Sequence, residues 1–468
     1  MGEGMTKDVE KLLGDPKRAI VLMMVPVIIA MTFQSLNSII NSVWVAGLGP
    51  SALAAVGLVF PVFFIIIAVG NGIGVGASQT VALHIGMGDK RGADKSAAQA
   101  IMLTIIASAI IAIVLGIFLR PLLMLMGGGN IIDECYEYAL PIVVFSPIVM
   151  LSSLFSNLLR SEGAAKRSMF IQVLTACINL VIDPFFIYQP FGFGLGWGIA
   201  GAAAGTVVSM FIGLSVALYW FKVKNDTYLK ISLKGFRFDR KIDRMIFRVG
   251  IPASLELMII SLVSIVMNII LIGAGGDDAV AIYTSSWRII SILMIPLMAT
   301  GGAMVPVCAA AFGARRFDRV REAYRYTLKL VVIIMLAISI VTALTAQYMA
   351  TIFTYTEATF HLRAEMVALL HFGCIFLPFA SWGATASALF QSLGMGTKSL
   401  ISTLVRNLVQ IPLCIFLFSV GGNLGFIWLG VALGEIVGSL LAGLWGESIL
   451  GNFMKHAEKY HPKEEKTV

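Results

Sequence analysis

The sequence predicts an all-α polytopic membrane protein, with twelve transmembrane helices in two pseudo-symmetric lobes of six. Its composition, the spacing of its apolar runs and a repeat of short motifs support this fold class. The chain has 468 residues, of which 58% are hydrophobic and only 13% are charged. A soluble domain carries about 25% charged residues. Most of this chain is therefore expected to lie in a lipid bilayer.

Apolar runs follow one another along the whole chain, each with the ~20 residues that a spanning helix needs. They occupy residues 19–46, 53–85, 97–119, 136–158, 169–189, 199–221, 246–274, 279–311, 328–349, 366–391, 399–420 and 425–450. This order predicts a tail over 1–18, an N-lobe over 19–221, a linker over 222–245, a C-lobe over 246–450 and a tail over 451–468.

Basic residues set the predicted orientation. Of the 34 Lys and Arg residues, 30 fall in the two tails or in alternate connections between the runs, nine of them in residues 222–248. Connections rich in Lys and Arg stay in the cytoplasm. Both termini are therefore expected to be cytoplasmic, in a multi-pass protein of the cell inner membrane. The basic excess reflects topology and requires no nucleic-acid partner.

The two lobes carry matching residues at a nearly constant offset. Pro26 matches Pro252, 226 positions later, and the pair Gly201 and Gly205 matches the glycines at 430 and 434. Transporters with parallel repeats of this kind rock two lobes around a central site. Alternate glycines over 70–76 are interpreted as helix-packing positions.

Asn179 and Asp183 are the candidate functional pair of the N-lobe. They lie four residues apart within an apolar run and therefore share one helix face. A carboxylate in the middle of a bilayer costs about 2.5–3.5 kcal/mol on insertion scales, so it usually faces a cavity or a partner. We interpret Asp183 as a proton- or ion-binding group; the alternative is an Asp near a helix end that reaches headgroup water.

Four further charged residues lie inside predicted spans of the C-lobe: Glu256, Arg288, Arg406 and Glu435. The simpler interpretation is two buried salt bridges, Arg406 with Glu435 and Arg288 with Glu256. The alternative is a second proton or substrate-cation site.

Other functional classes lack support in the sequence. There is no Walker A motif, so ATP is not expected to supply energy. No nucleophile–base pair stands out, which disfavours an enzyme, and no cofactor is expected. We expect a monomer whose partners are the bilayer and small amphiphilic substrates.

Several short motifs occur together, and their combination is specific. They are Leu-Gly-Asp15-Pro16-Lys, Ala52-Leu-Ala-Ala-Val-Gly57, Asn179-Leu-Val-Ile-Asp183-Pro and Thr284-Ser-Ser-Trp287-Arg288. In these motifs the chain resembles the multidrug and toxic compound extrusion (MATE) family, in its DinF-like prokaryotic branch. The resemblance implies a V of two six-helix lobes and cation-driven export of amphiphilic, often cationic, compounds.

The resemblance also implies a cation-coupling site in the N-lobe. Asn179, Asp183 and Thr206 match three positions of the family site, and Asn41 stands where the family has an aspartate. The matched residues would hold H⁺ or Na⁺, and Pro26 matches a proline that allows the first span to bend. One carboxylate then remains where the family motif has two, so we expect one monovalent cation per transport cycle.

The sequence therefore predicts a secondary antiporter, driven by H⁺ or Na⁺, that exports amphiphilic or cationic organic compounds by alternating access. One alternative is a flippase of lipids or lipid-linked substrates from the same superfamily. A second alternative, of a different class, is a membrane scaffold or receptor that transports nothing.

Overall fold

The structure, a computed structural model, describes residues 5–127, 129–189, 194–224 and 226–460. All the regular elements in these ranges are helices, as predicted. They are α1 (Lys7–Leu13), α2 (Pro16–Ala46), α3 (Pro50–Gly86), α4 (Lys90–Leu125), η1 (Gly129–Ile131), α5 (Ile132–Val144), α6 (Ser146–Ser161), α7 (Ala165–Ile187), α8 (Gly198–Tyr219), the π-helix η3 (Trp220–Lys224), α9 (Arg240–Leu293), α10 (Ile295–Gly313), α11 (Phe317–Thr351), α12 (Glu357–Phe360), α13 (Arg363–Ser392), α14 (Gly396–Gly421) and α15 (Leu424–Tyr460).

The helices are long and apolar enough to account for the predicted spans. In the described residues, 11 helices qualify, and the number rises to 12 if the bent pair 129–144 and 146–161 forms one span. The two parts of that pair meet at 53°. The break falls at Phe145, directly before Ser146 and Pro147, because a proline in the first helical turn starts a new helix.

The chain between residues 240 and 313 differs from the prediction. α9 begins at Arg240, so the linker is shorter than predicted. Gly276 has non-helical backbone angles, φ 66° and ψ −152°, and divides α9 into two arms where the seventh and eighth spans were separated. The predicted eighth span is itself broken at Met294, because the first turn of the new helix α10 contains Pro296.

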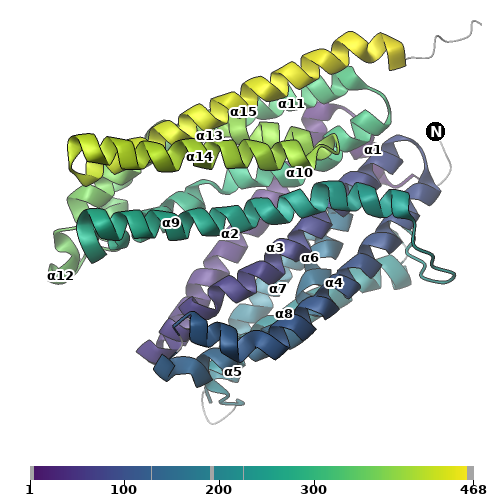
Figure 1. Ribbon diagram of the computed structural model, residues 1–468. Coiled ribbons are helices and arrows are strands. Elements are labelled where there is room, and N and C mark those ends of the chain that lie inside the picture. Colours follow the sequence, from purple (N-terminus) through teal and green to yellow (C-terminus); the bar gives the residue numbers. More distant parts are fainter. Residues whose placement is uncertain (1–4, 128, 190–193, 225, 461–468) are drawn as a thin grey trace, which may run out of the picture.

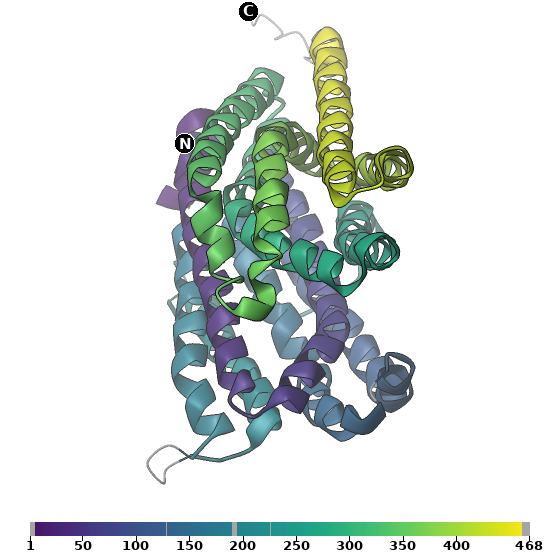
Figure 2. The same ribbon diagram turned by 90° about the vertical axis from the view of Figure 1, so that its left-hand side faces the viewer.

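The N-lobe contains α2–α8 and the C-lobe contains α9–α15. Figure 1 shows the two lobes meeting near α1 and diverging toward α5 and α12, which gives the V shape. Figure 2 views the molecule from the diverging side. We call the end where the lobes meet the linker side, because it carries the connection from α8 to α9, and the other end the open side.

Glycines allow the lobes to touch on the linker side. A Cβ atom at Gly72 would collide with Gly250 of α9, and one at Gly76 would collide with the backbone at Ile246. The other two glycines of this stretch, Gly70 and Gly74, lie against α6 within the N-lobe. The predicted packing role is therefore confirmed, and the four glycines serve two different interfaces.

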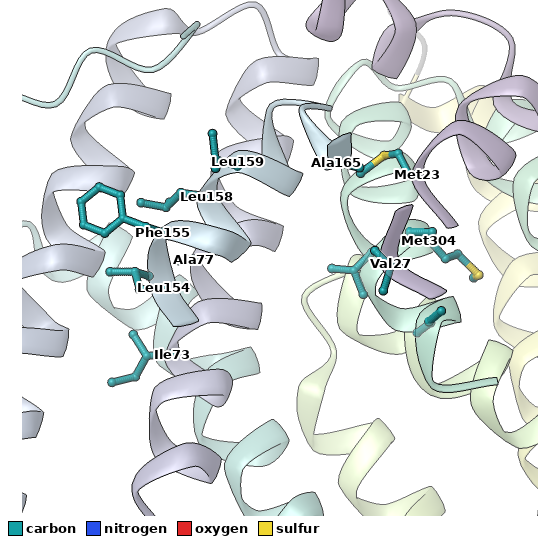
Figure 3. Close-up of a cluster of buried hydrophobic side chains, with 14 of the residues drawn as sticks. Met23, Val27, Ile73, Ala77, Leu154, Phe155, Leu158, Leu159, Ala165 and Met304 are labelled. Atoms are coloured by element: carbon teal, nitrogen blue, oxygen red, sulfur yellow. The ribbon is translucent and has the colours of Figure 1, made fainter. Parts of the chain in front are cut away.

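The lobes also meet where α2 and α3 pass α10. A Cβ atom at Gly86 would meet the backbone of Ala310, and one at Gly313 would meet the backbone of Leu83. Figure 3 shows the surrounding core, with Met23 and Val27 of α2 beside Met304 of α10, and Ile73 and Ala77 of α3 beside Leu154, Phe155 and Leu158 of α6.

The linker is bound to the N-lobe along most of its length. Its contacts are Asp226 with Arg167 (2.9 Å), Leu229 N–H with Glu162 (3.1 Å), Lys230 N–H with Asp94 (2.7 Å), the Arg237 carbonyl with Gln99 (2.7 Å) and Asp239 with Lys95 (2.7 Å). The basic connections of the N-lobe therefore share one side of the molecule with the linker.

Helix α1 was not predicted, since residues 1–18 were expected to be a tail. Thr6 caps it by accepting a hydrogen bond from the Val9 N–H at 3.4 Å, and Val9 and Leu12 are buried. The 3.6-residue spacing of these apolar residues is the signal that could have revealed it. At the other end, α15 extends past the predicted end of the last span, and residues 461–468 of the predicted tail lie outside the described residues.

Candidate functional site

Asp183 of α7 lies in the interior of the N-lobe, with no exposed surface, and Asn179 is only 3% exposed. Its Oδ1 atom accepts a hydrogen bond of 2.7 Å from Asn179 Nδ2. Its Oδ2 atom is buried and has no hydrogen-bond partner within the described residues. The alternative in which Asp183 reaches headgroup water is therefore wrong.

Small residues of α8 allow this helix to approach the Asp183 carboxylate closely. A Cβ atom at Gly205 would collide with Asp183 Oδ1, and one at Gly201 would collide with the backbone of Phe186. Glycines four residues apart form a flat strip on one face of a helix, which permits this close approach. The packing of α8 therefore covers Oδ1 of the carboxylate and contributes to its burial.

Helix α2 completes the site with Asn37. The Asn37 Nδ2 atom donates a hydrogen bond of 2.8 Å to Asn179 Oδ1, so Asn37, Asn179 and Asp183 form one chain of side chains. Asn41 lies one turn further along α2 and makes no hydrogen bond to the site in the described part of the protein. The sequence offered two asparagines four apart on one face, and only the register of α2 against α7 distinguishes them.

Thr206 follows Gly205 in α8 but is bonded elsewhere. Its Oγ1 atom donates to the Ala202 carbonyl of its own helix at 3.1 Å. Its neighbour Gly205, and not Thr206, makes the contact with Asp183. Of the four residues predicted for cation coupling, hydrogen bonds therefore connect only Asn179 and Asp183. The predicted hinge, Pro26, is buried within α2, one residue before a contact with Gly302 of the C-lobe.

The hydrogen-bonded chain of Asn37, Asn179 and Asp183 leaves one carboxylate oxygen without a partner in the described residues. The described residues contain no group of three or more His, Cys, Asp or Glu side chains that could hold a metal. Hard cations are bound by several oxygen atoms at once. Here Asp183 Oδ2 is unpaired, whereas Asn179 Oδ1 already accepts the Asn37 N–H. One unpaired carboxylate oxygen is sufficient for one proton.

In the C-lobe, one of the two predicted salt bridges is confirmed. Arg406 Nη1 of α14 lies 3.5 Å from Glu435 Oε2 of α15, and Glu435 is 7% exposed. A Cβ atom at Gly438 would collide with the Arg406 side chain, so a glycine again permits the approach of the two helices. The charges of this pair compensate each other.

The predicted pair of Glu256 and Arg288 is wrong. Glu256 Oε2 accepts hydrogen bonds from Ser387 at 3.4 Å and Gln391 at 3.3 Å, both on α13. Arg288 lies beyond the kink at Gly276, on the second arm of α9, and its side chain is exposed. The kink directs the two charges to different surroundings, a feature that the sequence pattern did not reveal.

Arg288 belongs to an exposed polar stripe on the second arm of α9. Thr284 and Ser291, about one turn away on either side, are exposed as well, whereas Tyr283 and Ile290 face the core. Arg288 makes no hydrogen bond or ion pair within the described residues. Since an unpaired charge toward lipid is costly, we expect this stripe to face the space between the lobes.

Two diverging helical lobes and a buried, half-unpaired carboxylate define a multi-pass membrane protein of the transporter class. The MatE family profile matches residues 26–185 and 252–416, one segment in each lobe. The chain therefore belongs to the MatE family, the MATE transporters, as the sequence motifs indicated.

Known relatives are similar over nearly the whole chain. An FAD transporter of Shewanella oneidensis is 28% identical over 419 residues, covering 87% of this chain and 88% of the relative. The multidrug export protein MepA of Staphylococcus aureus is 25% identical over 412 residues, covering 86% and 87%. A MATE family transporter solved in an outward-facing conformation has a TM-score of 0.92 and 37% identity, covering 97% of this chain and all of that one.

Proposed function

We propose that this MATE transporter is a proton-coupled antiporter that exports amphiphilic organic compounds, with Asp183 as the proton carrier. The observation that carries the proposal is the buried Asp183 Oδ2 atom without a partner. An ionised, unpaired carboxylate in this position costs far more than a protonated carboxyl group. Loading and release of one proton would therefore change the stability of the N-lobe interior in each cycle.

The second part of the proposal is that the two lobes expose the central site alternately to the two sides of the membrane. The described contacts between the lobes cluster on the linker side, at Gly72, Gly76, Gly86 and Gly313, while the helices diverge on the open side. This arrangement supports an outward-open state, if the linker side is cytoplasmic. The positive-inside rule supports that orientation in the inner membrane. A tag after Arg237 should report the cytoplasm, and a tag after Asp277 the outside.

Arg288 favours a second candidate substrate class. An exposed guanidinium in the apolar span favours a substrate with an anionic group. Among the relatives, one is named an FAD transporter, and FAD carries phosphate groups. Export of an anionic amphiphile, including a lipid-linked one, is therefore the alternative to export of cationic compounds.

Transport in proteoliposomes tests the proposal. Efflux of a cationic dye and of FAD is measured under a pH gradient alone and under a Na⁺ gradient alone. We expect the pH gradient to drive efflux and Asp183→Asn to abolish it, because that change preserves the shape and removes the titrating group. Asp278→Asn makes the same change at an exposed aspartate of the C-lobe and is the matched control. Equal efflux by the parent and Asp183→Asn would refute the role of Asp183, and efflux driven only by Na⁺ would refute proton coupling.

A further inference from the structure

A cavity of about 170 Å³ lies between the two lobes on the linker side. Its walls come from α1 and the start of α2, from the end of α3, and from α10 and α11. One water molecule needs at least about 15 Å³ of such space, so the cavity could hold a group much larger than water. It lies at headgroup level, because Pro16 begins α2 and Gly86 ends α3 there.

Two arginines provide the charge of this cavity. Arg319 Nη1 donates to the carbonyls of Leu13 at 2.7 Å and Gly14 at 3.1 Å, which fixes the direction of its guanidinium. Its other two nitrogens make no hydrogen bond within the described residues. Arg316, at the start of α11, is exposed, and its side chain has no partner in the same part of the chain.

The nearby acidic residues are already engaged or lie outside the lining. Asp15 accepts a hydrogen bond from the Arg18 N–H at 3.1 Å as the N-cap of α2. Glu322 pairs with Lys17 at 3.0 Å. Asp318 does not line the cavity. The lining of the cavity therefore carries an excess of positive charge.

The remaining lining is apolar and includes Leu12, Leu13, Val307 and Ala311. Guanidinium groups bind phosphate oxygens, and apolar walls suit glycerol or the start of an acyl chain. We propose that this cavity binds the phosphate headgroup of an anionic phospholipid from the leaflet on the linker side. Because both lobes build its walls, bound lipid favours the state in which the lobes meet there.

Lipid retention by the full-length protein tests the site without any transport measurement, so its failure is distinct from failure of the proposed antiport. The protein is released from nanodiscs of equal parts phosphatidylglycerol and phosphatidylcholine, and bound lipid is counted by native mass spectrometry. Each basic residue near an anionic lipid surface increases the binding of the anionic lipid about fivefold. Arg316→Gln should lower phosphatidylglycerol retention about fivefold.

Arg321→Gln is the matched control, because Arg321 is exposed on the same helix and does not line the cavity. It should change retention by less than about twofold. Equal retention in Arg316→Gln and the parent would overturn the site. Displacement of the lipid by millimolar inorganic phosphate would overturn the lipid assignment and identify free phosphate as the ligand.

The link to the conformational state has its own test. Gly72→Leu inserts a wedge between α3 and α9, away from the cavity, and should lower lipid retention several-fold by linkage. Gly57→Leu is the control, since nothing lies within 4 Å of a Cβ atom there. Gly250→Ala applies a smaller wedge to the same interface if the larger one prevents folding. Parent-like retention in the folded wedge variant would overturn the link.

Discussion

In the N-lobe, Asp183 of α7 lies against Gly205 of α8, and in the C-lobe Gln410 of α14 lies against Gly434 of α15. The two helix pairs therefore pack through glycines at corresponding positions. One turn before these residues, α7 carries Asn179 and α14 carries Arg406. The same packing arrangement thus presents a carboxylate with an amide in one lobe, and a guanidinium with an amide in the other.

The difference lies in how each lobe compensates its charge. Arg406 has Glu435 on the neighbouring helix at 3.5 Å, so this helix pair is closed by opposite charges, although Glu435 Oε2 makes no hydrogen bond within the described residues. Asp183 has only the amide of Asn179 and keeps one oxygen unpaired. A closed pair stabilises a fold in one charge state, whereas an unpaired carboxylate can alternate between two. The two corresponding helix pairs therefore differ in charge compensation, although elsewhere in the C-lobe Glu256 also has a buried carboxylate oxygen, Oε1, without a hydrogen-bond partner within the described residues.

The strongest test of this contrast removes one member of the C-lobe pair. Glu435→Ala leaves the half-buried Arg406, whose side chain is 23% exposed, uncompensated, which costs at most the about 3–5 kcal/mol of a fully buried pair. We expect a large loss of folded protein after detergent purification, and partial recovery in the double variant with Arg406→Ala. A Glu435→Ala protein that folds normally but no longer transports would transfer the coupling role to the C-lobe.

The contact between α8 and the carboxylate gives the next largest effect. Gly205→Ala places a methyl group against Asp183, and overpacking of this kind costs about 1–3 kcal/mol. We expect a lower melting temperature and slower proton-driven efflux. Gly57→Ala, in open space, should change neither quantity. A Gly205→Ala variant with parent-like efflux would show that the enclosure of Asp183 is not required.

The choice between two asparagines sharpens the description of the N-lobe site. Asn37→Ala removes the hydrogen bond to Asn179, worth about 1 kcal/mol, so efflux at limiting proton gradient should fall about fivefold. Asn41→Ala is the control, and should have less effect because Asn41 makes no hydrogen bond to the site. The opposite ranking in a dye-efflux assay would restore Asn41 as the partner from the first span.

The sequence could predict a side-chain contact when the two residues are close along the chain, and it could not when their contact depends on how separate helices pack. Asn179 and Asp183 are one turn apart on a single helix, so periodicity alone placed them together. Arg406 and Glu435 came from adjacent spans with matching repeats. Asn37 and Glu256 were beyond such reasoning, because their partners depend on helix register and on the kink at Gly276.

The fold was more predictable than the site, for a physical reason. Span number depends on runs of apolar residues, which the bilayer imposes on any helix that crosses it. Helix breaks depend on single residues, such as Pro296 at the start of α10. The apolar run continues across such a residue, so the run alone does not reveal the break. Helix α1 was missed because a short amphipathic segment resembles an ordinary tail.

The smallest expected effect concerns the linker side, where the N-lobe holds a second buried acid. Glu162, in the turn after α6, is 2% exposed, and burial raises its pKa to about 8. Because the folded protein then binds more protons than the unfolded chain, stability should fall as pH rises from about 4.5 to 8.

Glu162→Gln preserves an oxygen acceptor for the Leu229 N–H and removes the titration. We expect its melting temperature to match the parent at pH 4.5 and to exceed it by a few degrees, about 2–4 °C, at pH 9. Asp239→Asn is the control, since Asp239 is half-buried at the surface and its hydrogen bond with Lys95 lowers its pKa. A constant difference across pH would show that Glu162 does not titrate in this range.

The attachment of the linker to the N-lobe has a mechanical consequence. From Asp226 to Asp239 the chain is fastened to that lobe, and α9 starts at the next residue, Arg240. The covalent connection between the lobes is therefore short and fixed to the N-lobe, and it acts as a hinge rather than as a flexible linker. Relative sliding of the lobes is restricted near this point, so the freest remaining motion is a rotation about an axis close to the start of α9.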